Sequence, residues 1–74
     1  MQSELPPNRL KELREARGWK PYNVAHMIGA DPSTVYRWET GQSKMPDRMK
    51  LKLADLYGVT IAYMMGWPEH ADAA

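Results

Sequence analysis

Glycine and proline interrupt this chain so often that it can only fold into short elements. Proline cannot continue a helix or a central strand, and glycine commonly ends a helix. The chain must therefore consist of several short elements joined by tight connections. The breaks fall at Pro6, Pro7, Gly18, Pro21, Gly29, Pro32, Gly41, Pro46, Gly58, Gly66 and Pro68.

The first segment between these breaks carries apolar residues at helical spacing. Leu10, Leu13 and Ala16 recur every third residue up to Gly18, which predicts a helix that ends at this glycine. The charged residues expected on its wetter sides are Arg9, Glu12 and Arg14.

A second helix is predicted from Pro21 to Gly29. Proline suits the first helical position, where its missing N–H is not needed. Lys20 precedes it and has no short side-chain acceptor, so this helix is expected to start weakly. Its apolar stripe would consist of Val24, Ala25 and Ile28.

The third segment, ADPSTVYRWETG at residues 30–41, has both a start and a stop signal for a helix. Asp31 can act as N-cap, Pro32 suits the first turn, and Gly41 can end the helix. The segment offers only two large apolar side chains for burial, Val35 and Trp38. This raises the question of what the other side of the helix does.

The last two segments are also predicted to be helices. Residues 49–53 alternate like a strand, but helical spacing continues to Tyr57 and Gly58 supplies a stop, so a helix over 46–57 is favoured. Thr60 can then cap a short fifth helix. The fifth segment carries Ile61, Met64 and Met65 and is closed by Gly66 and Pro68.

Five short helices in a chain of 74 residues predict one compact all-α domain with a thin core. The tightest joint is Gly29-Ala30-Asp31, between the second and third helices. Two short helices joined by a turn of three or four residues that contains glycine form the helix-turn-helix arrangement.

Several classes of function find no support in the sequence. The absence of cysteine excludes disulfides and cysteine-based metal sites. His26 and His70 stand apart without a convincing set of acidic ligands, so no metal and no cofactor are expected. We find no phosphate-binding glycine loop, no nucleophile beside a base and no paired carboxylates, so an enzyme with a small-molecule substrate is not expected. No segment is apolar enough for a membrane span or a secretory signal, which favours a cytoplasmic protein.

Charge is unevenly distributed along the chain. The net charge is only +1, but residues 8–52 carry all ten Lys and Arg against five acidic residues, a local balance of +5. Solvated helix faces would explain this asymmetry, and so would a surface directed at phosphates.

A helical wheel gives the third helix two different sides. With Ser33 at zero, Tyr36 lies near about −60°, Arg37 near about +40° and Thr40 near about −20°. The apolar residues Val35 and Trp38 lie near about 200° and 140°. Most such polar faces are merely solvated. This one, however, mixes hydroxyl, aromatic and guanidinium groups, and an arginine can bind guanine O6 and N7 in the major groove of DNA.

Three segments resemble the Cro/cI, or XRE-type, helix-turn-helix proteins, which include lambdoid phage repressors, Cro proteins and many bacterial regulators. The resemblance implies a five-helix, lambda-repressor-like domain that binds operator DNA, usually as a dimer on two half-sites. The segments are NRLKELREARGW (8–19), VAHMIGADPSTVYRWETGQSK (24–44) and LADLYGVTIAYMMGW (53–67).

The resemblance also implies roles for individual residues. The third helix would be the recognition helix, and Arg14 would pair with Glu39 to hold the first helix to the third. Residues expected to face the bases are Pro32, Ser33, Tyr36 and Arg37. Residues expected to contact phosphate are Arg9, Lys20, Tyr22, Thr40, Gln42, Ser43 and Lys44. Two positions depart from the family pattern: Lys20-Pro21 stands where Ser or Thr followed by Gln is common, and Thr40 where Asn is frequent.

An apolar cluster near the C-terminus is open to two interpretations. Ile61 and Met64 are expected to complete the core. Part of Tyr63, Met65 and Trp67 is expected to form a self-association patch, because exposed apolar clusters often mark interfaces.

The sequence thus predicts an N-terminal arm (1–7), a DNA-binding domain (8–67) and a flexible C-terminal tail (68–74). The expected function is sequence-specific binding of double-stranded operator DNA by a homodimeric transcriptional regulator, most simply a phage or bacterial repressor, in the bacterial nucleoid or infected host cytoplasm. The alternative is a protein-interaction module or antitoxin of the same fold.

Overall fold

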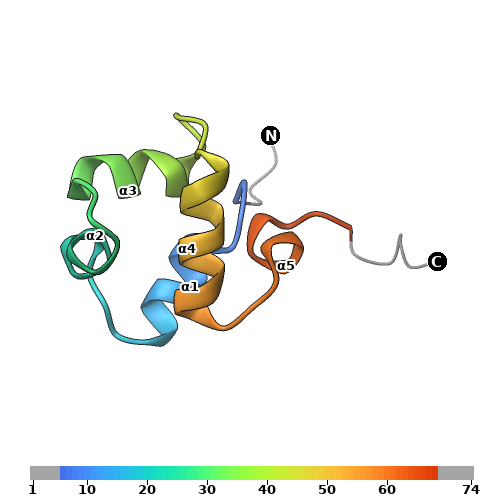
Figure 1. Ribbon diagram of the computed structural model, residues 1–74, viewed down its shortest axis with the longest axis horizontal. Helices are drawn as coiled ribbons and strands as arrows, with labels where there is room; N and C mark the ends of the chain where they lie inside the picture. Colours follow the sequence, from blue (N-terminus) through green and yellow to red (C-terminus); the bar gives the residue numbers. More distant parts are fainter. Residues whose placement is uncertain (1–5, 69–74) are drawn as a thin grey trace.

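The computed structural model describes residues 6–68, and all the regular structure in this range is helical. Five helices joined by short connections form this range, arranged as in Figure 1, which confirms the predicted all-α fold. Their bounds are Leu10–Ala16 (α1), Pro21–Ile28 (α2), Pro32–Thr40 (α3), Asp47–Tyr57 (α4) and Ile61–Met65 (α5).

The helices cross one another rather than running side by side. α3 lies lengthwise across one end of the molecule, and α2 is seen end-on beneath the beginning of α3 (Figure 1). α4 runs through the middle, with α2 on one side and α5 on the other. α2 packs most extensively against α3, while α1 contacts both α3 and α5. Each helix therefore holds at least one neighbour in place without a long parallel interface.

The core lies where these helices meet, and every helix contributes to it. Val35 and Trp38 of α3 are both buried, as the wheel predicted. Met64 of α5 is fully buried and Ile61 packs against the core, which confirms their expected structural role. The buried apolar residues are Leu10, Leu13, Val24, Ala25, Ile28, Val35, Trp38, Met45, Leu53, Ala54, Tyr57 and Met64.

The buried side of α1 includes Leu10 and Leu13, as predicted, but differs from the prediction at two other residues. Ala16 is exposed, although its spacing placed it with the core residues Leu10 and Leu13. Arg14, expected on a wetter side, is only 7% exposed. The every-third-residue pattern misled because it drifts around a helix of 3.6 residues per turn. α1 therefore buries a charged residue that the spacing argument had assigned to solvent.

The start signals of the helices were predicted with mixed success. The Thr60 hydroxyl accepts a 3.0 Å hydrogen bond from the Tyr63 N–H, which confirms it as the cap of α5. Asp31 occupies the N-cap position of α3, but its side chain makes no capping bond. At the start of α2 the Asn23 Oδ1 accepts a 2.7 Å bond from the Lys20 N–H. This back-bonding supports the α2 start that had been expected to be weak.

None of the helices within residues 6–68 is long and apolar enough to cross a membrane. The longest, α4, has 11 residues, and a spanning helix needs about 20. The predicted arm (1–7) and tail (68–74) lie largely outside the described residues, as does His70.

Candidate nucleic-acid interface

The joint between α2 and α3 sets the direction of α3. Gly29 ends α2 with φ +76°, a left-handed conformation that a side chain would strain. The N–H of Ala30 then donates back to the Ala25 carbonyl at 2.9 Å. The chain therefore reverses within a few residues and lays α3 across α2 (Figure 1).

The inner face of α3 is anchored by an ion pair as well as by apolar packing. The Arg14 Nε donates to Glu39 Oε2 at 2.7 Å, and its Nη2 donates to Oε1 at 3.0 Å. Both side chains are almost entirely buried. The hydrogen bond to Glu39 raises the pKa of Arg14 above its ordinary value, against the lowering effect of burial. This two-pronged contact fixes the rotation of α3 relative to α1.

The third donor of Arg14 reaches a different segment. Its Nη1 donates to the Trp19 carbonyl at 2.8 Å, so one guanidinium joins α1, α3 and the connection that leads into α2. The Trp19 ring lies 6.2 Å from the ring of Tyr57 and packs against the core. The ring therefore makes a hydrophobic contact just after Gly18, where α1 has ended.

The outer face of α3 is open to solvent over its whole length. Tyr36 is 55% exposed, which leaves most of its ring free. The Arg37 Nη2 makes a long, 3.4 Å contact with the Thr34 hydroxyl one turn earlier. The structure brings together on this face all the residues predicted to face bases, and all of them are exposed: Pro32, Ser33, Tyr36 and Arg37.

The turn after α3 is held by its own side chains. The Thr40 Oγ1 lies 3.1 Å from the Tyr36 carbonyl and 3.3 Å from the Arg37 carbonyl, and it accepts a 2.9 Å bond from the Gln42 Nε2. The Gln42 N–H also donates to the Arg37 carbonyl at 2.9 Å. The predicted phosphate-contacting residues of this turn are thus pre-arranged, and Lys44 beyond them is exposed.

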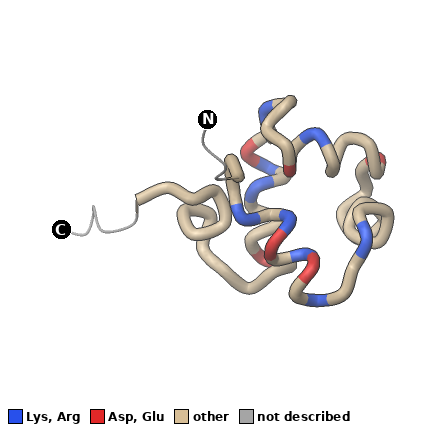
Figure 2. The backbone as a smooth tube through the Cα atoms, turned by 180° about the vertical axis from the view of Figure 1, so that it is seen from behind, with Lys and Arg blue, Asp and Glu red and all other residues tan. Residues whose placement is uncertain are grey.

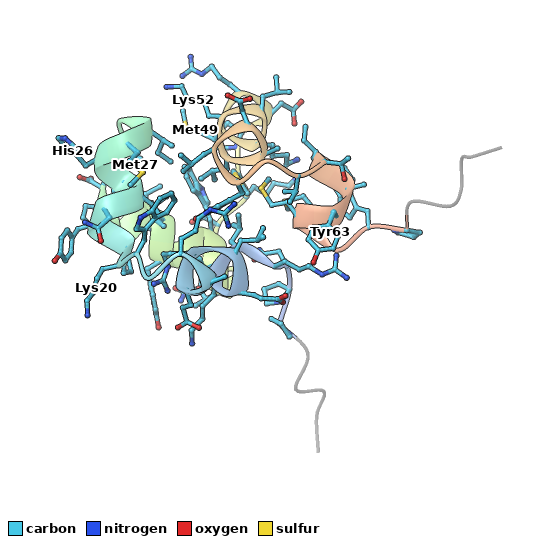
Figure 3. The ribbon with its side chains drawn as sticks, turned by 90° about the horizontal axis from the view of Figure 1, so that it is seen from below. Lys20, His26, Met27, Met49, Lys52 and Tyr63 are labelled. Atoms are coloured by element: carbon cyan, nitrogen blue, oxygen red, sulfur yellow. The ribbon has the colours of Figure 1, made fainter. Side chains whose placement is uncertain are left out.

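The start of α2 presents a second group of predicted phosphate ligands. Lys20 is exposed, and Figure 3 shows its side chain pointing away from the body of the molecule. Tyr22 is 60% exposed on the first turn of the same helix. Helix N-termini carry unpaired N–H groups and a partial positive charge that favour anions.

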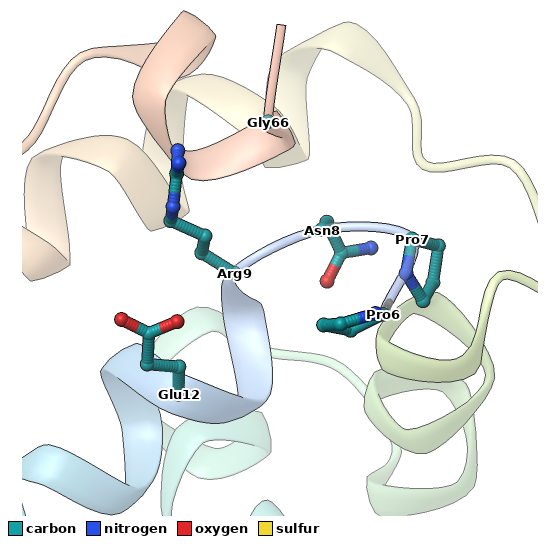
Figure 4. A pocket seen from close by; sticks show the side chains of 6 residues that line it. All are labelled: Pro6, Pro7, Asn8, Arg9, Glu12 and Gly66. Carbon is teal, nitrogen blue, oxygen red and sulfur yellow. The ribbon is translucent and has the colours of Figure 1, made fainter. Parts of the chain in front are cut away.

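Arg9, predicted to contact phosphate, is bound to Tyr63 of α5 instead. Its Nη1 donates to the Tyr63 carbonyl at 2.5 Å, and its guanidinium carbon lies 4.2 Å from the centre of the Tyr63 ring. Figure 4 shows the side chain directed toward α5. To reach a phosphate, as predicted, Arg9 would have to leave this contact.

The predicted self-association residues differ in how open they are. Tyr63 is 37% exposed with Arg9 over its ring, and Trp67 is 49% exposed with the Lys50 Nζ 5.3 Å from its ring centre. Met65 is partly buried against the core. The patch is therefore partly covered by cations of the same chain.

Basic residues are not gathered on one side of the molecule. Figure 2 shows Lys and Arg on several sides of the chain, with acidic residues close to some of them. The local charge of +5 is therefore only partly available to an anionic ligand at α3.

Among the described residues no group of three or more His, Cys, Asp or Glu side chains is placed to bind a metal.

Sequence reasoning missed three polar side chains around α3. Thr34 contacts Arg37, and Lys52 of α4 donates to the Ile28 carbonyl at the end of α2 at 3.2 Å. Asn8 is 7% exposed and bonds to the Trp38 carbonyl at 2.9 Å. Only Asn8 had a usable signal, since an asparagine just before a periodic segment often accepts a hydrogen bond from the backbone N–H two residues on.

Comparison with known proteins supports the assignment of α2 and α3 as a helix-turn-helix. The model of a family described as a helix-turn-helix domain matches residues 8–63, which include all five helices up to Tyr63. No curated protein and no solved structure matched the chain at a significant level. The match covers well over half of the chain and includes the joint between α2 and α3 on which the motif depends. The chain therefore belongs to the helix-turn-helix domain family, of the XRE, Cro/cI-like type, whose members bind DNA.

Proposed function

We propose that this protein is a sequence-specific transcriptional regulator, most simply a repressor or Cro-like protein, that reads the major groove of double-stranded DNA with α3. The observation that carries the proposal is the exposed outer face of α3, which sits on an inner face fixed by the Arg14–Glu39 pair. A major groove admits one α-helix, and base edges are read by side chains on its outer face.

Arg37 is the proposed principal base reader. Its guanidinium is exposed and makes only the long contact to Thr34 within the described residues. A bidentate contact to guanine O6 and N7 would use two of its donors. Ser33 and Tyr36 would add contacts at neighbouring positions, and Pro32 would face the bases at the start of the helix.

Two groups would hold the duplex backbone on either side of α3. At the start of α2 these are Lys20 and Tyr22. After α3 they are Thr40, Gln42, Ser43 and Lys44. Contacts of this kind orient a protein on DNA without reading its sequence. Arg9 would join them only after release from Tyr63.

We also propose that two copies bind together on DNA. Tyr63, Met65 and Trp67 are the candidate contact residues, supported by the exposed fractions of the two aromatic rings. Two half-sites about one helical turn apart, roughly 34 Å, would suit this arrangement. Sedimentation of the protein with a full operator and with a half-site tests this, and one copy bound to each full operator would contradict it.

Selection of binding sites from a pool of random duplexes tests the main proposal. We expect a conserved site with two related halves. Affinity for random duplex DNA should also fall as salt rises, with a slope close to −0.9 for each phosphate neutralised. Lys44→Ala should reduce that slope by about one.

Lys11→Ala is the matched control, because Lys11 is an exposed lysine of α1 with no proposed DNA contact. It should change the slope less than Lys44→Ala does. A flat salt response of the wild-type protein, with no selected sequence, would contradict the proposal. It would instead favour a protein partner for the outer face of α3.

A further inference from the structure

A short segment before α1 connects two distant parts of the fold. Residues 7–9, here called the strap, run between α5 and the end of α3 (Figure 4). On the α5 side, the Arg9 N–H donates to the Met64 carbonyl at 2.8 Å. On the α3 side, the Pro7 ring packs so closely on Gly41 that a Cβ there would lie 3.2 Å from Pro7 Cγ.

Asn8 lies at the centre of the strap and uses both ends of its amide group. Its Nδ2 donates to the Trp38 carbonyl at 2.9 Å, and its Oδ1 accepts from the Leu10 N–H at 3.0 Å. The residue is 7% exposed. One side chain thus bonds the first turn of α1 and a carbonyl in the last turn of α3, 30 residues away.

The Trp38 carbonyl lies at the base of the turn that follows α3. The last four carbonyls of a helix lack partners within the helix, so they depend on groups from outside it. At Trp38 these groups are the Gly41 N–H, at 3.2 Å, and the Asn8 amide. Gly41 ends α3 and leads directly into Gln42, Ser43 and Lys44.

We propose that Asn8 is a positioning residue for DNA binding. Its amide N–H holds the end of α3, and with it the turn over residues 40–44, where that turn meets the DNA backbone. Asn8 itself touches no nucleotide. This inference rests on the proposed function, and it adds a residue outside the helix-turn-helix unit to the machinery that sets affinity.

A purely structural role would require only the hydrogen bond that the Asn8 Oδ1 accepts from the Leu10 N–H, and the two roles can be separated chemically. Serine at position 8 keeps a side-chain acceptor for the Leu10 N–H, since serine hydroxyls, like asparagine side chains, accept from the backbone N–H two residues on. Its hydroxyl is too short to reach the Trp38 carbonyl. Alanine loses both bonds. Neither substitution changes the charge of the surface.

The test compares wild type, Asn8→Ser and Asn8→Ala for affinity to the selected operator and for thermal stability. We expect the melting temperature to fall in the order wild type, serine, alanine. Affinity should instead fall about tenfold in both variants, the equivalent of about 1.4 kcal/mol for one lost hydrogen bond. Wild-type affinity in Asn8→Ser would overturn the inference, because the hydrogen bond to the Leu10 N–H alone would then suffice.

Amide NMR spectra of the free proteins supply a second measurement that does not depend on DNA. Both variants should shift the amide signals of residues 41–44 and leave those of α2 in place. An unchanged turn would overturn the positioning role even if affinity fell. A wild-type protein that selects no DNA sequence would overturn the proposed function as well, whereas wild-type binding with unaffected variants would overturn only this inference.

Discussion

The two faces of α3 differ in the burial and pairing of their charged side chains. On the inner face, Glu39 is almost fully buried and accepts two N–H groups from Arg14. On the outer face, Arg37 is exposed and, within the described residues, has only one long hydrogen bond, to Thr34. Hydrogen bonds satisfied within the protein serve stability, and unsatisfied donors in solvent remain available to a ligand. On the proposed function, the inner face of α3 would serve stability and its outer face DNA recognition.

The substitution with the greatest expected consequence removes the ion pair on the inner face of α3. Glu39→Ala leaves Arg14 buried without its partner and should lower the free energy of unfolding by about 3–5 kcal/mol. Urea denaturation of the two proteins measures it. The control removes both charges with Arg14→Met and Glu39→Met together, which should recover much of the loss because apolar pairs of similar volume replace buried ion pairs well. A loss below about 1 kcal/mol in the single variant would mean that water screens the pair.

The substitution with the second-largest expected consequence removes Arg37 from the outer face of α3. Arg37→Ala should cost about 1–3 kcal/mol of discrimination at one base position, with stability within about 0.5 kcal/mol of wild type. Competition binding to operators substituted at each position measures the first, and urea denaturation the second. Equal weakening on every DNA sequence would instead make Arg37 a phosphate contact and reduce the contrast between the two faces.

A pH titration tests whether the core around Tyr57 of α4, a residue only 3% exposed, excludes water. Burial, with a smaller contribution from Glu39, raises the pKa of Tyr57 to about 12. An unfolded tyrosine has a pKa of about 10, so the folded state favours the neutral form. The resulting stability is fully present below about pH 10 and is lost as the pH approaches about 12, roughly 1 kcal/mol of it by pH 11.

Denaturation of wild type and Tyr57→Phe at several alkaline pH values checks this. The stability of wild type relative to the variant should decline over this range, because phenylalanine has no proton to lose. A constant difference would mean that water reaches the Tyr57 hydroxyl.

The smallest expected effect concerns the hydroxyl of Tyr36. Tyr36→Phe should weaken operator binding by about 0.5 kcal/mol, the loss of one exposed hydrogen bond, and leave stability unchanged. Affinity and a repeated site selection measure it. Identical affinity and identical preference would leave the ring, rather than its oxygen, as the contributing group.

The helices could be predicted because their signals are local. Gly29, Gly41 and Thr60 act on their immediate neighbours, and each fixes a helix end as the sequence indicated. The two sides of α3 also followed from spacing alone, since a helical wheel needs only the residues of one element.

Contacts between distant residues could not be derived in the same way. The Asn8 amide meets a carbonyl 30 residues away, and the Arg17 Nη2 meets the Tyr57 carbonyl 40 residues away at 2.7 Å. Nothing at either position in the sequence specifies the other, because such a pairing depends on how several helices cross. The burial of Arg14 illustrates this: spacing placed it in solvent, and only the resemblance to a family paired it with Glu39.

The shortness of the helices has a consequence for how the domain opens. The five helices have 5 to 11 residues, and isolated helices shorter than about 12–15 residues are marginal in water. None of them can persist once its neighbours are gone, so partial opening has no stable stopping point. Core amides from α1 to α5 should exchange with solvent at one common free energy, and an excised peptide of residues 32–40 should be a random coil.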